Sequence, residues 1–242
     1  MEVETTSTIP RFASTLLIAF PDVLMAGPRI LLSADTQGTP SNTETSIAAW
    51  SHYCTPVSKK KSASPPTTDT TGKILYSAGH LGASDVSIGL LTVLVAPPTT
   101  EQASNLCEAI VSQAKASGTS QIILVASSNV TPTTATGLNL TSLSQTTHQL
   151  QISESQQLSL PVLPMNASLG DHILSTLVAL LTFSRISTTA LAILDDLVSA
   201  LLQISIGGQA NAAGRLFSAE KAFQYNISVK DEESSVGHLM YL

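Results

Sequence analysis

Residues 88–126 read IGLLTVLVAPPTTEQASNLCEAIVSQAKASGTSQIILVA, and they decide the fold class of this chain. The stretch opens with an apolar, β-branched run that two prolines end at positions 97 and 98, and it closes with a second apolar run at 121–126. Runs of this length and composition predict buried strands. The residues between them predict a helix, so the whole stretch predicts a strand–helix–strand unit.

The predicted helix carries signals for its beginning, its buried face and its end. Thr99 and Gln102 stand at the spacing of a capping box, and Gly118 stands where a glycine ends a helix. Between them apolar residues recur at the spacing of one helix face, at Ala103, Leu106, Cys107, Ile110, Val111 and Ala114. A strand–helix–strand unit of this kind predicts a right-handed crossover in a sheet that is covered on both faces.

A similar unit follows in the second half of the chain. Asp171 can cap a helix that runs to about residue 184, and an apolar, β-branched strand is expected at 188–194. Residues 14–20 predict a further buried strand near the N-terminus. Together these elements predict an α/β fold with a central, mostly parallel sheet and helices on both faces.

The remaining segments define the expected domain organisation. Residues 1–226 are expected to form a single α/β domain with loop-like insertions near 36–72 and 131–157, because these stretches are polar and lack a clear period. Three bulky residues, Trp50, Tyr53 and Cys54, are expected to pin the first insertion to the body.

Three shorter segments are also assigned from the sequence. Residues 30–32 fit either a short extended piece or the end of a helix, and residues 79–82 are expected to follow a short strand at 74–77. A helix is predicted from 209 to 225, after the break at Gly207 and Gly208. Residues 227–242 are expected to form a flexible C-terminal tail.

Composition narrows the classes of partner. The chain has 242 residues, of which 12% are charged, and its formal net charge is −6, which argues against nucleic acid because phosphate binding needs clustered Lys and Arg. The one basic run, Lys59 to Lys61, is interpreted as a solvated loop. The longest apolar run, residues 173–183, is too short to cross a bilayer.

Two cysteines and an acidic, polar N-terminus indicate a reducing compartment rather than a secreted disulfide framework. We therefore expect a cytoplasmic protein, with the nucleus as an additional compartment, and no membrane partner.

The last residues of the sequence combine features of a docking peptide. A polar, charged run is followed by Met240, Tyr241 and Leu242. Met and Leu could each contribute roughly 1.5–3 kcal/mol if fully buried in a receptor, and Tyr adds an apolar face with a hydroxyl. A terminal carboxylate can be captured by a Lys or by backbone amides. These three residues are therefore the predicted partner-binding residues.

The order of these features resembles the proteasome assembly chaperone 1 family, one subunit of the heterodimer that templates the proteasome α-ring. The resemblance is carried by residues 121–130 as strand and turn, 170–186 as helix, 190–196 as strand, and the ending Met240-Tyr241-Leu242, which is similar to the hydrophobic–Tyr–any-residue ending of proteasome-binding tails. The N-terminal half matches poorly. The second subunit of the heterodimer and a divergent relative therefore stay open.

The resemblance implies a non-catalytic chaperone that uses no cofactor. Its partners would be the proteasome α-subunits and a second, related assembly chaperone, and its tail would enter a pocket between α-subunits. A Lys of the ring would meet the carboxylate of Leu242. Two weak tails on one rigid heterodimer would favour an assembled ring over single subunits through effective concentration.

An enzyme is the first alternative. Polar residues stand at predicted strand and helix ends, namely Ser127, Ser128, Asp171, His172, Asp195 and Asp196, and α/β folds bind substrates at such ends. However, the chain has no Gly-x-Ser-x-Gly, Walker-type or Gly-x-Gly-x-x-Gly motif. Helix capping and solvation explain the Asp residues more simply.

A metal-binding protein and an adaptor are two further alternatives. The five His and two Cys show no pair at metal-ligand spacing, so no metal site is predicted. An adaptor whose C-terminus is read by a peptide-binding domain would use the same tail with another receptor. Ring docking should depend on the side chain of Tyr241, whereas simple carboxylate capture should depend mainly on Leu242.

Overall fold

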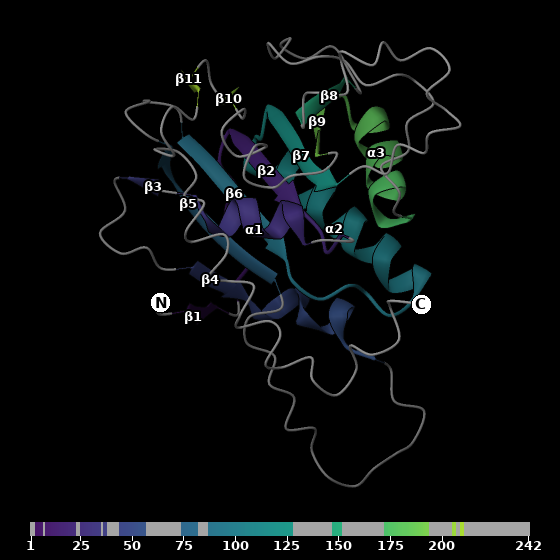
Figure 1. Ribbon diagram of the computed structural model, residues 1–242. Coiled ribbons are helices and arrows are strands. Elements are labelled where there is room, and N and C mark those ends of the chain that lie inside the picture. The colour runs from purple at the N-terminus through teal and green to yellow at the C-terminus, as the bar shows by residue number, and fades with distance from the viewer. Residues whose placement is uncertain are drawn as a thin grey trace, which may run out of the picture.

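The central strands of the sheet run parallel to one another in the computed structural model (Figure 1). The structure describes residues 3–6, 8–22, 25–34, 36–37, 44–56, 74–81, 87–127, 147–151, 172–193, 205–206 and 209–210. In the order of the sheet, the central strands are β6 (Ser87–Val93), β2 (Thr15–Ala19), β7 (Gln121–Ser127) and β9 (Ser187–Ile193). All five residues of β2 are buried, as expected for a parallel strand that is covered on both faces.

Antiparallel strands flank this parallel centre. On one side β5 (Ile74–Leu81) pairs with β6, and β4 (Glu44–Ile47) and β3 (Thr36–Gln37) both pair with β5. There β1 (Val3–Thr6) pairs with β4 in parallel and ends the sheet. On the other side β8 (Thr147–Gln151) pairs with β9. Nine of the strands in the described residues belong to this one sheet.

Helix α2 (Thr100–Ser117) begins and ends where the sequence predicts. The Oγ1 atom of Thr99 accepts a hydrogen bond from the backbone N–H of Gln102 at 3.1 Å and donates to Oε1 of Gln102 at 3.0 Å. Gly118 has φ 76° and its N–H bonds the carbonyl of Lys115 at 3.1 Å, so the left-handed end that glycine adopts without strain is confirmed. All six apolar residues of the predicted face are buried.

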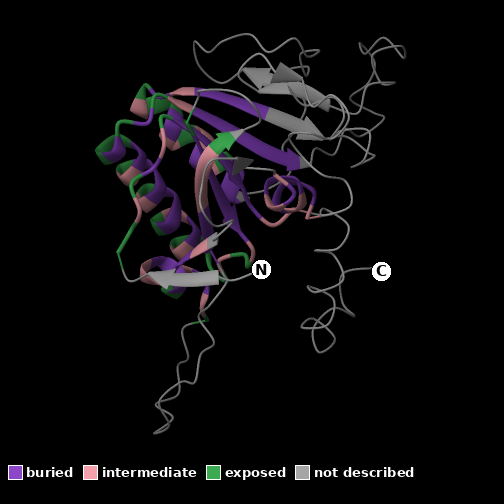
Figure 2. Cartoon of the chain, turned by 90° about the vertical axis from the view of Figure 1, so that its left-hand side faces the viewer, coloured by how far each residue is buried: buried purple, intermediate pink, exposed green. Residues whose placement is uncertain are grey.

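Most of the core lies between one face of the sheet and three helical elements. These are α2, α3 (His172–Ser184) and the 3-10 helix η1 (Ala48–Cys54). From the sheet, alternate residues of each strand face them, for example Ile18 and Leu124. Trp50 and Cys54 are buried in this core and Tyr53 packs against it, which confirms that they pin their segment to the body. Figure 2 shows the buried central strands in purple and the exposed outer sides of the helices in green.

The opposite face of the sheet is covered by α1 (Ala26–Leu32). Gly27 lies against β2 and β7, where an added Cβ would overlap the carbonyl oxygen of Val125 and come within 3.1 Å of the Cβ of Ala19. The absence of a side chain at Gly27 therefore allows the helix to approach the strands closely. With helices on both faces, the predicted α/β class with a mostly parallel sheet is confirmed, and residues 30–32 are the end of a helix.

The structure differs from the sequence reading in several segments. Strands β3 and β4 and the helix η1 lie within 36–72, and β8 lies within 131–157, because short polar strands at the flanks of a sheet lack the apolar signal of central strands. Strand β5 continues to Leu81 rather than ending near residue 77, since its pairing with β6 extends to His80 and Ser87.

The helix predicted from residue 209 is wrong at its start. Instead, β10 (Ser205–Ile206) pairs antiparallel with β11 (Gln209–Ala210), with Ile206 opposite Gln209. In the sequence, Gly207-Gly208 stands between these two strands, where the sequence analysis predicted only the break before a helix. The rest of that predicted helix, 211–225, lies outside the described residues.

Candidate functional site

The predicted docking residues Met240, Tyr241 and Leu242 lie outside the described residues, as does the whole predicted tail 227–242. The structure therefore provides the body to which this segment is attached. The described body offers three features that bear on function: the strand ends, a pocket beside α1, and the polar contacts that fix the segment before β2.

The ends of β7 and β9 lie side by side at the carboxyl edge of the sheet. Ser127, the last residue of β7, is paired in register with Ile193, the last residue of β9. In the sequence, the candidates Ser127-Ser128 and Asp195-Asp196 therefore stand at the ends of neighbouring strands. Ser128, Asp171, Asp195 and Asp196 lie outside the described residues, and His172 is the first residue of α3, with a side chain that is not described. Of these candidate positions, the described residues place together only the backbones of the two strand ends.

Asp22 at the same edge is a polar residue whose role the sequence reading missed. Its Oδ1 accepts a hydrogen bond from the N–H of Ala26 at 2.7 Å, and its Oδ2 accepts one from the N–H of Gly27 at 3.2 Å. The first amides of α1, which in other α/β proteins bind anionic ligands, are therefore taken by a carboxylate of this chain. The signal for this cap was the Pro21-Asp22 pair directly after the strand.

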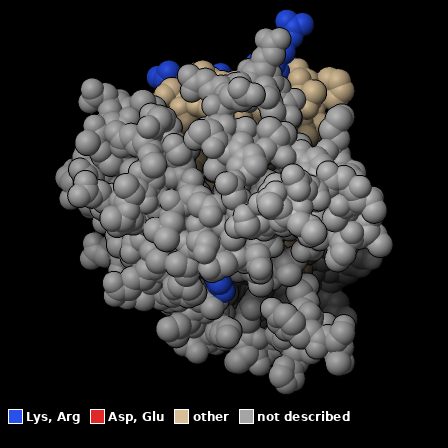
Figure 3. Space-filling model, turned by 45° about the horizontal axis from the view of Figure 1, so that its top comes forward, with Lys and Arg blue, Asp and Glu red and all other residues tan. Residues whose placement is uncertain are grey.

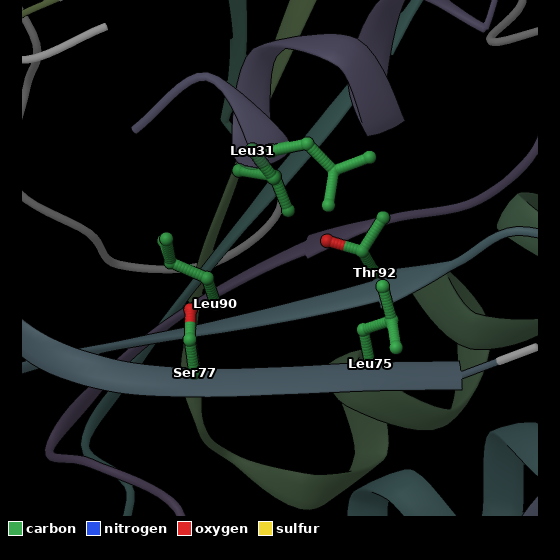
Figure 4. A pocket seen from close by; sticks show the side chains of 6 residues that line it. Leu31, Leu75, Ser77, Leu90 and Thr92 are labelled. Atoms are coloured by element: carbon green, nitrogen blue, oxygen red, sulfur yellow. The ribbon is translucent and has the colours of Figure 1, made fainter. Parts of the chain in front are cut away.

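A small cavity of about 10 Å³ lies between the end of α1 and strands β5 and β6 (Figure 4). In the ladder, Leu75 stands opposite Thr92 and Ser77 opposite Leu90, so hydroxyl and aliphatic side chains alternate on its floor. Leu31 and Leu32 complete the lining. The lining residues supply hydroxyls and methyl groups, and the volume is below the roughly 300–1,000 Å³ that small-molecule sites require. This cavity has room for about one water molecule.

Tyr76 is the buried titratable residue that fixes the segment before β2. Its hydroxyl accepts a hydrogen bond from the N–H of Ala13 at 3.1 Å and donates to the carbonyl of Arg11 at 3.2 Å. Burial raises the pKa of Tyr76 above its ordinary value of 10.0, and the hydrogen bond from Ala13 partly opposes this shift. Because the hydroxyl is held by backbone groups on both sides, Tyr76 has a structural role.

The end of α2 fixes the same segment. The Oγ of Ser117 accepts from the N–H of Phe12 at 2.9 Å, and the Oγ1 of Thr119 donates to the carbonyl of Ala13 at 2.9 Å. Phe12 also packs its ring against Tyr76 and Trp50, with ring centroids 5.2 and 6.0 Å apart. These contacts join the segment before β2 to η1, β5 and α2.

Charged side chains are sparse on the described surface. Figure 3 shows one face of the molecule, on which described Lys and Arg side chains are visible and described Asp and Glu side chains are not. Among the described residues, no group of three or more His, Cys, Asp or Glu side chains could hold a metal ion. No described helix is long and apolar enough to cross a membrane.

No family model and no curated protein matches this sequence. Solved structures do match its fold. A structure described as Pyrococcus furiosus PbaA, an archaeal homolog of proteasome-assembly chaperone, has a TM-score of 0.52 and 13% identity, covering 93% of this chain and 92% of that one.

Two further structures are similar to a comparable degree. One is a protein of unknown function from Corynebacterium glutamicum, with a TM-score of 0.52, 13% identity and coverage of 95% and 87%. The other is a protein with unknown function from Thermoplasma acidophilum, with a TM-score of 0.51, 9% identity and coverage of 90% and 85%. At these identities the likeness concerns the fold, and we conclude that this chain shares the α/β fold of PbaA over nearly its whole length.

Proposed function

We propose that this chain is a proteasome assembly chaperone. Paired with a second chaperone of related fold, it binds the α-ring of the proteasome through its C-terminal residues Met240, Tyr241 and Leu242, and promotes assembly of the ring without catalysis. Its site of action is the cytoplasm, with the nucleus as an additional compartment.

One conjunction supports this proposal. The fold is similar to that of an archaeal homolog of proteasome-assembly chaperone over 93% of the chain, and the same sequence ends in a hydrophobic residue, a tyrosine and a carboxyl-terminal leucine. The fold and the ending are independent observations, because one depends on the described body and the other on residues outside it.

In this proposal the tail makes the contact with the ring and the body positions the tail. The entropy lost when a short peptide becomes ordered offsets much of the binding free energy that burial of Met, Tyr and Leu contributes. A single tail therefore binds weakly. A body that carries the tail to the correct place raises its effective concentration, and a second tail on a partner subunit raises avidity further. Such a protein binds an assembled ring more firmly than a single α-subunit.

The test is co-purification with α-ring intermediates from cell extract, compared among three proteins. These are the unchanged chain, a chain lacking residues 240–242, and Tyr241→Ala. We expect both variants to lose most of the bound α-subunits, and a roughly tenfold loss corresponds to about 1.4 kcal/mol. Tyr241→Phe is the matched control, since it keeps the ring and removes only the hydroxyl. Unchanged recovery of α-subunits with the deletion variant would contradict the proposal.

The adaptor alternative gives a different pattern. If a peptide-binding domain reads the terminus, removing or extending Leu242 should abolish binding while Tyr241→Ala changes it little. The mass of the C-terminal peptide of the native protein must first show that Leu242 is its last residue, because both mechanisms require that carboxylate.

A further inference from the structure

The Lys and Arg side chains that are exposed on the described part of the chain lie at one edge of the sheet. They are Arg11, Lys115 and Arg185. Arg11 precedes β2, Lys115 lies in the last turn of α2, which leads into β7, and Arg185 joins α3 to β9. Because β2, β7 and β9 run parallel, all three residues lie where these strands begin. We call this side of the molecule the amino edge.

The ends of α2 and α3 lie together at the amino edge. Near the middle of α2, Sγ of Cys107 donates to the carbonyl of Ile173, the second residue of α3, at 3.6 Å. From this contact each helix continues for about 15 Å before it ends, at about 1.5 Å per residue. At the end of α2, Nε of Arg11 donates to the carbonyl of Ser117 at 3.3 Å. The three cations are therefore carried by elements that contact one another.

Two exposed apolar side chains lie at the same edge. Ile9 is 40% exposed, and the carbonyl of the next residue accepts a hydrogen bond from Gln113 of α2 at 2.7 Å. Phe183, in the last turn of α3, is 86% exposed. The exposed acidic side chains of the described part, Glu101 and Glu108, lie in the first turn and the middle of α2. The amino edge therefore combines cations with apolar groups. Cations also complement the dipoles of helix ends, but that interaction needs no exposed apolar neighbours.

Arg185 is held in a conformation that arginine rarely adopts. Its φ is 59°, in the left-handed region, and the residue that follows α2 in the same region is Gly118, with φ 76°. Glycine ends a helix in this way without strain, whereas a residue with a Cβ is strained there. Backbone strain of this kind is concentrated at functional sites. The strained backbone therefore supports a role for the exposed guanidinium of Arg185.

We propose that the amino edge binds the acidic run Asp231-Glu232-Glu233 of this chain's own tail. This run is the one place in the sequence where three acidic residues are consecutive, and Val229 and Val236 flank it. The segment thus offers carboxylates to the three cations and aliphatic side chains to the two apolar residues of the amino edge. No other stretch of this sequence complements both features of the edge.

The run is near enough to reach this edge. Twenty residues, 211–230, separate it from the last described residue, and they span up to about 70 Å when extended, against a radius of gyration of about 18 Å for a folded chain of this length. Each exposed ion pair is weak and is screened by salt. However, a tethered segment has an effective concentration in the millimolar range, so the contact forms reversibly in each molecule.

The contact would fix the point from which the docking residues leave the body. Residues 240–242 lie beyond the acidic run, so they stay available to a receptor, and only the residues after 233 remain as a free leash. A shorter leash raises the effective concentration of the docking residues near the amino edge. This consequence rests on the proposed function, whereas the contact itself does not.

Energy transfer within the full-length chain tests the contact. Trp50, the only tryptophan, is the donor, and a dye on Ser235→Cys is the acceptor, since Cys54 and Cys107 are buried and react slowly. We expect transfer to fall as salt rises to 1 M, where the screening length is about 3 Å. Lys115→Glu combined with Arg185→Glu should lose most of the salt-dependent transfer. Asn105→Glu is the matched control, because it adds an acidic side chain on the exposed side of α2 far from its end.

Charge reversal on both sides makes the test specific. Glu232→Lys with Glu233→Lys should also lose the salt-dependent transfer, and combining these changes with Lys115→Glu and Arg185→Glu should restore it. Transfer that is independent of salt in the unchanged chain, or that survives both reversals, overturns the proposal. Transfer that disappears on dilution with unlabelled chain also overturns it, because the tail then binds another molecule. If the contact is absent but residues 240–242 are still needed for co-purification of α-subunits, only this inference is wrong and the proposed function stands.

Arg185→Gly separates the role of the guanidinium from a structural role. Glycine relieves the strain at φ 59°, so the unfolding midpoint should rise, while the salt-dependent transfer should fall. A rise in the midpoint with unchanged transfer would show that Arg185 takes no part in the contact.

Discussion

The hydroxyl of Tyr76 joins β5 to the backbone of the segment before β2, and it does so as donor and acceptor at once. Tyr76→Phe keeps the ring contact with Phe12 but leaves the N–H of Ala13 without this acceptor. We expect the free energy of unfolding to fall by about 1–3 kcal/mol, measured by urea denaturation. Tyr53→Phe, at a half-buried tyrosine of η1, serves as control and should change stability less.

The raised pKa of Tyr76 predicts a dependence of stability on pH. Because burial favours the neutral phenol, the unfolded chain loses this proton at lower pH than the folded chain. The contribution of this raised pKa to the free energy of unfolding is present in full below the ordinary pKa of 10.0. It is lost as the pH rises from there through the pKa of Tyr76 in the folded chain. Urea denaturation at several pH values above 10.0 should therefore show a shallower decline for Tyr76→Phe than for the unchanged chain. Parallel declines would contradict this assignment.

Gly27 permits the close contact of α1 with the sheet. Gly27→Ala places a methyl group into the backbone of β7 at Val125, and backbone cannot move aside as a flexible side chain does. We expect a loss of about 3 kcal/mol or more in the free energy of unfolding. Gly118→Ala is the comparison, because a Cβ there meets nothing within 4 Å and the change costs only about 1–2 kcal/mol of backbone strain at φ 76°. Equal losses for the two variants would show that the contact at Gly27 relaxes.

At the scale of elements, the cap of α2 also connects that helix to η1. Thr99 holds the N–H of Gln102, and Nε2 of Gln102 donates to the carbonyls of His52 at 3.0 Å and Thr55 at 2.8 Å. Thr99→Ala should lower the free energy of unfolding by about 0.5–2 kcal/mol, measured by thermal or urea denaturation. Thr99→Ser keeps the acceptor and should restore most of this loss. If the two variants are equally destabilised, the hydroxyl does not act as a cap.

The elements that sequence predicts best are those with local signals. The helix α2 is predicted by Thr99, Gln102 and Gly118 together with its apolar face, and strands β2, β6, β7 and β9 are predicted by their β-branched runs. The flanking strands β3 and β4 were missed, because a short polar strand owes its conformation to the neighbour with which it pairs. Asp22 was recognised as the end of a strand but not as a cap, since a cap is defined by its hydrogen bonds, here to the backbone N–H groups of Ala26 and Gly27.

For the whole molecule, the class of the fold follows from the alternation of strands and helices, but the order of the strands does not. The sequence suggests that β6 and β7 are linked by α2, yet β2 lies between them in the sheet and pairs in parallel with both. Long-range pairing of this kind leaves no periodic signal in a single sequence. The strand order is seen in the structure but is not predictable from the sequence. For the tail the reverse holds: a short sequence motif predicts it, and the described residues do not include it.

If the docking residues 240–242 are separate from the body, as we propose, their removal should leave the body intact. A chain lacking residues 240–242 should unfold with the same midpoint and enthalpy in scanning calorimetry as the unchanged chain, while losing its α-ring partners. A fall in the midpoint would mean that these side chains pack within this molecule, and the docking proposal would then be wrong.

The position of β2 also has a consequence for synthesis of the chain on the ribosome. The segment before β2 is held by groups 106 residues later, such as Thr119, and β2 itself receives its second neighbour only with β7. Because β2 precedes β7 in the chain, this apolar strand must remain without one of its two neighbours until residues 121–127 have left the exit tunnel. During that interval the nascent chain exposes an unpaired, apolar strand edge that is prone to aggregate. We therefore expect this protein to bind cotranslational chaperones during its own synthesis.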